Sequence, residues 1–108
     1  MKVDLRAVAD PALESGVPQG AALLAFADAV VGRDVLALDA ARRILRDELG
    51  AAALVQVAAI AANFSMNDRA ANAVGIVLEP MFVRDSADYR AELGINAYPS
   101  ARNTLKAV

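Results

Sequence analysis

The chain has 108 residues, 57% of them hydrophobic, and its 11 basic and 13 acidic residues give a net charge of −2. This length fits one domain, and the near-neutral balance gives no electrostatic drive toward nucleic acid. Cysteine and histidine are both absent, which excludes a disulfide framework, a thiolate nucleophile and thiolate or imidazole metal sites, so we expect no metal and no cofactor.

Residues 1–17 are predicted to form a lead segment with a short helix that Pro11 breaks. Acidic residues interrupt the apolar run that an export signal needs, so we expect a cytoplasmic protein. The excess of arginine over lysine is typical of a GC-rich bacterial genome. The first long helix is predicted to begin at Pro18, because proline suits a first turn, and to stop at Gly32, a favourable left-handed cap.

A second helix is predicted from Val35 to Leu49, with Asp34 as its N-cap and Gly50 as its exit. Apolar residues recur at helical spacing on one side of it, namely Leu38, Ala41, Leu45 and Leu49. The charged residues that lie off this stripe are Arg42, Arg43, Arg46, Asp47 and Glu48. We interpret them as a solvated face rather than a binding patch.

The third helix is predicted from Ala52 to Val74, and its first half is apolar except at Gln56. It would be about 34 Å long, but its apolar run is too short to cross a bilayer. Because only Gly50 separates it from the preceding helix, we expect the two to pack antiparallel. The expected fold is all-α, an antiparallel helical bundle around this one long central helix, with residues 18–75 as a three-helix core.

Polar side chains fall on two sides of this helix. Gln56, Asn63 and Asn67 lie within a sector about 40° wide, and Arg69 and Asn72 lie on the opposite side. An unpaired amide in an apolar interior costs about 1 to 3 kcal/mol, so each amide needs a partner. The amides either bond adjacent helices and fix their register, or line a cavity or a subunit contact. These five residues form the candidate ligand-binding set, in which Arg69 is either an anion clamp or one half of an ion pair.

The segment 76–80 is apolar and ends in a proline, which predicts an extended segment laid over the bundle. Asp85 or Ser86 is predicted to cap a short helix that reaches Leu93 and stops at Gly94. Familiar catalytic signatures are absent: the sequence has no glycine-rich phosphate loop and no serine with a base beside it. We therefore expect this segment to have a structural role rather than a catalytic one.

The last segment, Ile95 to Val108, carries Arg102 and Lys106 with no acidic residue nearby in the sequence. This pattern indicates an arm that docks on a neighbouring subunit. We interpret residues 76–108 as a C-terminal extension and arm of a single helical domain that covers residues 1–108.

Small apolar residues lead to Asn63-Phe64, and these are followed by Asn67-Asp68-Arg69 and by Asn72-Ala73-Val74-Gly75. In this pattern the segment 21–80 resembles the alkylhydroperoxidase D and carboxymuconolactone decarboxylase family. The resemblance implies an all-helical fold built on an antiparallel pair, and assembly into trimers or hexamers through apolar helix faces. It also implies thiol peroxidase chemistry in some members and lactone decarboxylation in others.

The chain lacks the groups on which that chemistry depends. The peroxidase branch of the family uses a Cys-x-x-Cys helix with a histidine, at a place that would precede Ala21, and the decarboxylase branch also depends on histidine. No catalytic residue carries over, and the matching positions Asn67, Arg69, Asn72 and Gly75 are assigned a structural role. The chain is similar to the C-terminal part of the family fold, either encoded alone or left after loss of the catalytic half.

Two hypotheses follow. The first is a non-catalytic, homo-oligomeric member of this family that binds a small ligand or a partner protein and has no nucleic-acid or membrane partner. The second is an enzyme, peroxidase-related or decarboxylase-like, that another chain completes or that uses carboxylates and Arg69 at a subunit boundary. The missing cysteine and histidine favour the first hypothesis.

Overall fold

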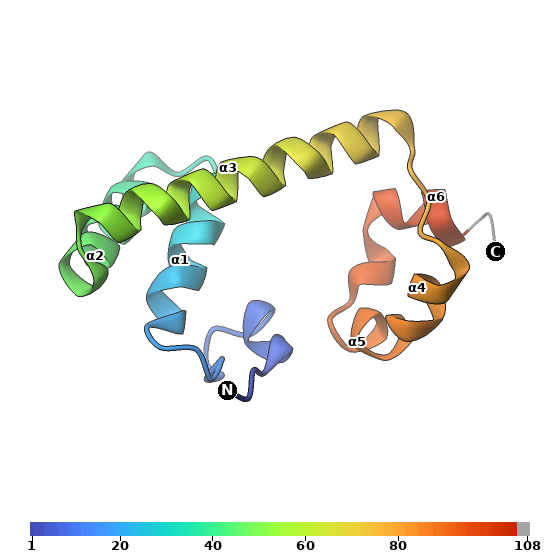
Figure 1. Ribbon diagram of the computed structural model, residues 1–108, viewed down its shortest axis with the longest axis horizontal. Helices are drawn as coiled ribbons and strands as arrows, with labels where there is room; N and C mark the ends of the chain where they lie inside the picture. Colours follow the sequence, from blue (N-terminus) through green and yellow to red (C-terminus); the bar gives the residue numbers. More distant parts are fainter. Residues whose placement is uncertain (106–108) are drawn as a thin grey trace. The chain divides into compact units, whose positions relative to one another are not determined.

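The computed structural model describes residues 1–105, and all regular structure within them is helical (Figure 1). The all-α prediction is therefore confirmed. The elements in chain order are η1 Leu5–Val8, α1 Gly20–Val31, α2 Val35–Leu49, α3 Ala51–Val74, α4 Pro80–Asp85, α5 Ala87–Glu92, η2 Ile95–Ala97, η3 Pro99–Ala101 and α6 Arg102–Leu105. The chain divides into two compact units, Met1–Met66 and Asn67–Val108. A single domain over residues 1–108 stays a prediction.

The lead segment contains the short 3-10 helix η1, which ends before Pro11 as predicted. Helix α1 begins at Gly20, two residues later than the predicted start at Pro18. The reason is Gln19, whose φ of 52° is left-handed and cannot continue a right-handed helix. The expected left-handed cap at Gly32 is also wrong, because Gly32 has a φ of −77° and leaves the helix in an extended conformation.

Helix α2 has the predicted bounds, and local chemistry explains both ends. The carboxylate of Asp34 accepts hydrogen bonds from the backbone N–H groups of Leu36 and Ala37, at 3.0 and 3.1 Å. At the other end Gly50 has a φ of 89°, which lets the chain turn into α3 within one residue. The predicted apolar stripe is confirmed, with Leu45 fully buried and Ala41 buried.

The core of the first unit lies between α1 and α2, the two helices with the most extensive mutual contact. Its buried residues are Phe26 of α1 and Ala41 and Leu45 of α2. Helix α3 adds only the partly buried Leu54 and Val57 to this core. The expected packing of α2 along α3 is therefore limited to the short stretch around these two residues. The stripe packs mainly on α1, which supplies the large Phe26 side chain as its cover.

Helix α3 runs for 24 residues, one residue longer at its start than predicted. At 1.5 Å per residue it is about 36 Å long. None of its residues is buried within the chain. In the described part of the chain, no helix combines the length and the apolar character that a membrane crossing requires.

In the second unit the segment 76–79 is neither helix nor strand, Glu79 has the predicted extended conformation, and a side-chain hydrogen bond attaches the middle of the segment to α6. The backbone N–H of Leu78 donates to Oγ1 of the buried Thr104, at 2.9 Å. Pro80 does not end this segment but occupies the first position of α4, where its missing N–H costs nothing. The segment is therefore attached to α6 and passes directly into α4.

The predicted short helix after Ser86 is confirmed as α5, Ala87–Glu92, with Leu93 as its C-cap, and a further helix, α4, lies directly before it. Ser86 lies between them and does not cap α5 with its side chain. Its Oγ instead donates to the carbonyl oxygen of Phe82, at 2.6 Å. The predicted stop is confirmed, since Gly94 follows α5 with a φ of 70°.

Arg90 connects the elements of the second unit. Its guanidinium donates to Oγ of Ser86 at 2.8 Å, to the carbonyl oxygen of Val83 at 2.7 Å and to Oδ1 of Asn96 at 2.6 Å. The expected arm is folded as far as Leu105, because η2, η3 and α6 follow one another there. Lys106 and Val108 lie outside the described residues.

Candidate functional site

The five candidate ligand-binding residues are all exposed, and the structure does not bring them together. Gln56, Asn63 and Asn67 share one face of α3, while Arg69 and Asn72 lie on its other side. Arg69 forms no ion pair with any residue in the range 1–105. The five side chains therefore do not form one pocket within the chain.

The face that holds the three amides points away from the core of the first unit. Leu54 and Val57, the α3 residues that pack against that core, lie about 130° around the helix from the middle of the amide row. Gln56, Asn63 and Asn67 are exposed for this reason. The expectation that burial within the chain forces partners on these amides is therefore wrong for a single copy.

Helix α3 exposes large apolar side chains on several sides. The exposed fractions are 68% for Val55, 58% for Ile60 and 62% for Phe64. No charged residue occurs from Ala51 to Asn67. A helix that is apolar all round is normally buried in a protein interior or an interface, whereas a surface helix carries a charged face as α2 does. Helix α3 thus has the composition of a buried helix and the exposure of a surface helix.

The total exposed surface also indicates that the chain leaves an unusually large area uncovered. The chain exposes 8130 Å². Two separate compact proteins with the masses of the two units would together expose about 6,800 Å². Even when the units are counted separately, the chain exposes an excess on the order of 1,000 Å². A standard protein interface covers about 800 Å² on each partner, so the excess is large enough for one.

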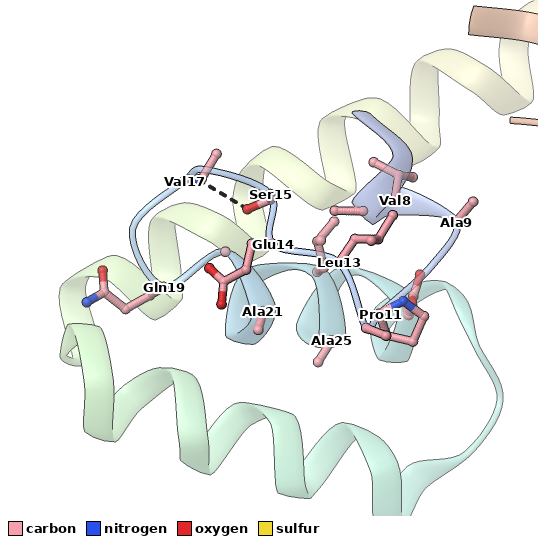
Figure 2. Close-up of a pocket in the computed structure, with 15 residues that line it drawn as sticks. Val8, Ala9, Pro11, Leu13, Glu14, Ser15, Val17, Gln19, Ala21 and Ala25 are labelled. Carbon is pink, nitrogen blue, oxygen red and sulfur yellow. Dashed lines mark hydrogen bonds between the residues drawn. The ribbon is translucent and has the colours of Figure 1, made fainter. Parts of the chain in front are cut away.

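A separate cavity lies between the lead segment and α1, and it has a volume of about 440 Å³ (Figure 2). Small apolar side chains line most of it, including Ala21, Leu24 and Ala25 of α1. Its charged lining residues are Glu14 and Asp28. None of the five candidate residues lines it. With no histidine or cysteine in the chain, the cavity offers carboxylates and apolar surface but no strong nucleophile.

The sequence gives only a weak signal for this cavity, because it exists only where the lead segment folds back on itself. The backbone N–H of Asp4 donates to the carbonyl oxygen of Ser15 at 2.9 Å, and Ser15 Oγ accepts from the Val17 N–H at 3.2 Å. The turn residues from Ser15 to Gly20 are the visible trace of this fold-back in the sequence.

The lead segment also contains a charged pair that shifts a pKa. Arg6 donates to the carboxylate of Asp4 through its side chain, with 2.6 Å between Nη2 and Oδ2, and through its backbone N–H at 3.0 Å. These hydrogen bonds, the side-chain bonds first, lower the pKa of Asp4 from 3.8 to about 2. Asp4 does not line the cavity, so this pair organises η1 rather than the candidate site.

Comparison with known proteins found no matching family model, no similar curated protein and no similar solved structure. The resemblance of residues 21–80 to the alkylhydroperoxidase D and carboxymuconolactone decarboxylase family therefore stays a prediction.

Proposed function

We propose that the chain is a non-catalytic helical module that assembles with copies of itself, and that α3 is the element through which the copies meet. One observation carries the proposal: the longest helix has no buried residue and no charge from Ala51 to Asn67. Water is a poor environment for such a helix, because each exposed apolar side chain forgoes about 1.5 to 3 kcal/mol of burial free energy. Association of copies recovers part of that free energy.

The proposal includes descent from the alkylhydroperoxidase D and carboxymuconolactone decarboxylase family. The pattern from Asn63 to Gly75 supports this descent. The antiparallel bundle expected around α3 would then form between copies, because α3 contributes only the partly buried Leu54 and Val57 to the described core of the first unit. The missing thiol and imidazole groups support a role in assembly or binding rather than in catalysis.

Size-exclusion chromatography with light scattering tests the proposal. The unmodified chain is expected to have at least about twice its single-chain mass of 11.2 kDa. The double variant Ala59→Glu, Asn63→Glu places two charges on the exposed face of α3 and is expected to be monomeric. Burying unpaired carboxylates costs several kcal/mol, which exceeds what the contact can supply at these positions.

Arg43→Glu is the matched control. It changes the net charge by the same amount as the double variant, but it lies on the exposed face of α2 and should leave the assembly intact. Circular dichroism verifies that all three proteins are equally helical. An unmodified chain that runs at 11.2 kDa over a hundredfold range of concentration would contradict the proposal.

A further inference from the structure

We infer that the cavity between the lead segment and α1 binds a small aliphatic amine, with the ammonium group at Asp28 and the hydrocarbon chain along one side of α1. Every residue that lines the cavity belongs to the first unit, Met1–Met66. The inference therefore goes beyond the proposed assembly, and it does not require copies of the chain to meet through α3.

Helix α1 uses opposite sides for the core and for the cavity. Its core side carries the buried Phe26. The other side lines the cavity with residues that recur at the spacing of one helix face, namely Ala21, Leu24, Ala25 and Asp28. Two of these four residues are alanines, so the lead segment can lie across α1 without filling the space between them. The resulting volume of about 440 Å³ lies within the range of about 300 to 1,000 Å³ that is usual for small-molecule sites.

The charges of the lining select a cation. Glu14 and Asp28 are its acidic residues, and none of the described residues that line the cavity is basic. Within the range 1–105, neither of these carboxylates forms an ion pair. A carboxylate repels an anionic ligand and gains no charge interaction from a neutral one, whereas an ammonium group attracts it. The cavity therefore favours a positively charged ligand over an anionic or neutral one.

An organic cation fits the cavity better than a metal ion does. Protein-bound metal ions need several ligating side chains, and the described part of the chain contains no group of three or more that could hold one. Figure 2 shows Val8 and Leu13 on the lead-segment side of the cavity, and they leave 61% and 39% of their surface exposed. An alkyl chain would cover this apolar surface, whereas a hydrated metal ion would leave it in water. The ligand is therefore a cationic group on a hydrocarbon chain.

The helix dipole distinguishes the two carboxylates. Asp28 lies in the last turn of α1, where the carbonyl groups make the helix end negative and no basic residue offsets them. Glu14 lies at the opposite end, because its neighbour Ser15 packs so closely on Gly20 that a Cβ added there would lie 2.0 Å from Ser15 Oγ. Figure 2 shows Glu14 near Ala21 in the first turn of α1, where the dipole is positive and offsets its charge. The ammonium group is therefore placed at Asp28.

The length of the cavity side and its exposure set the expected affinity. Gly20 and Asp28 are about 12 Å apart along the helix axis, which leaves room for a chain of several carbons. Asp28 is exposed, so its ion pair with an ammonium group contributes only modestly. The alkyl chain supplies most of the affinity, about fourfold for each methylene that it buries. The charge then supplies the selectivity between ligands of equal chain length.

An NMR titration of the isotope-labelled chain tests the site, with hexylammonium chloride as the probe. Amide signals of the lead segment and of the cavity side of α1 are expected to shift and to saturate with a Kd on the order of 1 mM. Hexanol has the same chain without the charge and should bind about fivefold more weakly. Hexanoate has the opposite charge and should give no saturable shift. Butylammonium, which is two methylenes shorter, should bind about fifteenfold more weakly than hexylammonium.

Two pairs of variants locate the bound amine. Asp28→Asn removes the partner of the ammonium group and should weaken hexylammonium binding about fivefold. Asp47→Asn removes an equal charge from α2, outside the cavity, and should change it by less than about twofold. Ala25→Leu fills the cavity and should abolish saturation, whereas Ala27→Leu makes the same exchange on α1 outside the lining and should not. Circular dichroism verifies that each variant is folded, and Asp28→Asn still tests the site if Ala25→Leu is not.

Several results would overturn the inference. They are the absence of saturation up to about ten times the expected Kd, binding of hexanoate as tight as that of hexylammonium, and shifts that are confined to α3 or that persist in Ala25→Leu. Glu14→Gln should weaken binding less than Asp28→Asn does, and the reverse order would overturn the placement of the ammonium group. Light scattering on the same samples measures assembly separately, so a failure of this inference is distinguishable from a failure of the proposed function.

Discussion

Asp34 sets the start of α2 through two hydrogen bonds to otherwise unpaired N–H groups. Asp34→Ala removes both bonds, and we expect it to lower the free energy of unfolding by about 1 kcal/mol. Urea denaturation followed by circular dichroism measures this change. Asp47→Ala, at an exposed position of the same helix, should change it by less than about 0.5 kcal/mol. Equal effects of the two variants would show that the cap does not stabilise α2.

The ionisation of Asp4 makes the stability of the lead segment depend on pH. Its pKa is about 2 in the folded chain and 3.8 without its partners, so the folded state binds fewer protons between these values. The stabilisation from the Asp4–Arg6 pair is therefore complete above pH 4 and is lost as the pH falls toward 2. An NMR titration of the Asp4 carboxyl carbon should give a midpoint near 2.

The same titration has a direct control. Arg6→Ala should raise the midpoint toward 3.8, because the side-chain donor is gone. Arg84→Ala removes an equal charge far along the chain and should leave the midpoint unchanged. A midpoint near 3.8 in the unmodified chain would refute the hydrogen-bonded geometry of the pair.

Caps that act on the adjoining helix end could be predicted, and side chains that bond back to the preceding turn or across a turn to the next element could not. The cap at Asp34 and the exit at Gly50 depend on neighbours within four residues, and both predictions are confirmed. Ser86 was expected to cap a helix, but its hydroxyl bonds backward to Phe82. Arg90 looks like any surface arginine in the sequence, because its three acceptors become neighbours only after folding.

At the scale of elements, periodicity identifies which face of a helix is apolar but not which element covers it. The α2 stripe from Leu38 to Leu49 was correct, yet its main partner is α1 rather than α3. Short connections occur on both sides of α2, so loop length could not decide between the two neighbours. For the candidate site, the amide face of α3 followed from helix geometry, and only its solvent exposure had to come from the structure.

The segment 76–79 is attached to α6 by a side-chain hydrogen bond. Thr104→Val keeps the shape of the side chain but removes the acceptor for the Leu78 N–H. We expect a loss of about 1 kcal/mol in the free energy of unfolding and faster hydrogen exchange at the Leu78 amide. Thr104→Ser retains the hydroxyl and should retain the protection. Unchanged exchange in the valine variant would show that the bond does not hold the segment.

At the scale of the whole molecule, composition and exposed area both indicate that the chain leaves apolar surface uncovered. A chain that is 57% hydrophobic could be expected to keep apolar surface exposed, and α3 carries five of the large apolar residues that remain exposed, namely Val55, Ile60, Phe64, Met66 and Val74. The cavity beside α1 could not be predicted in this way, because a fold-back of the lead segment creates it. Composition thus predicts that apolar surface stays exposed, and only the fold shows on which elements it lies.

Under the proposed assembly, the uncharged stretch of α3 would also govern the fate of newly made chains. Before assembly, the longest helix of each chain would expose apolar surface of the kind that chaperones and proteases recognise. Pairing is second order in concentration, so slow synthesis would lengthen this vulnerable period and fast synthesis would shorten it. Abundance of the mature protein should therefore rise more steeply than its rate of translation.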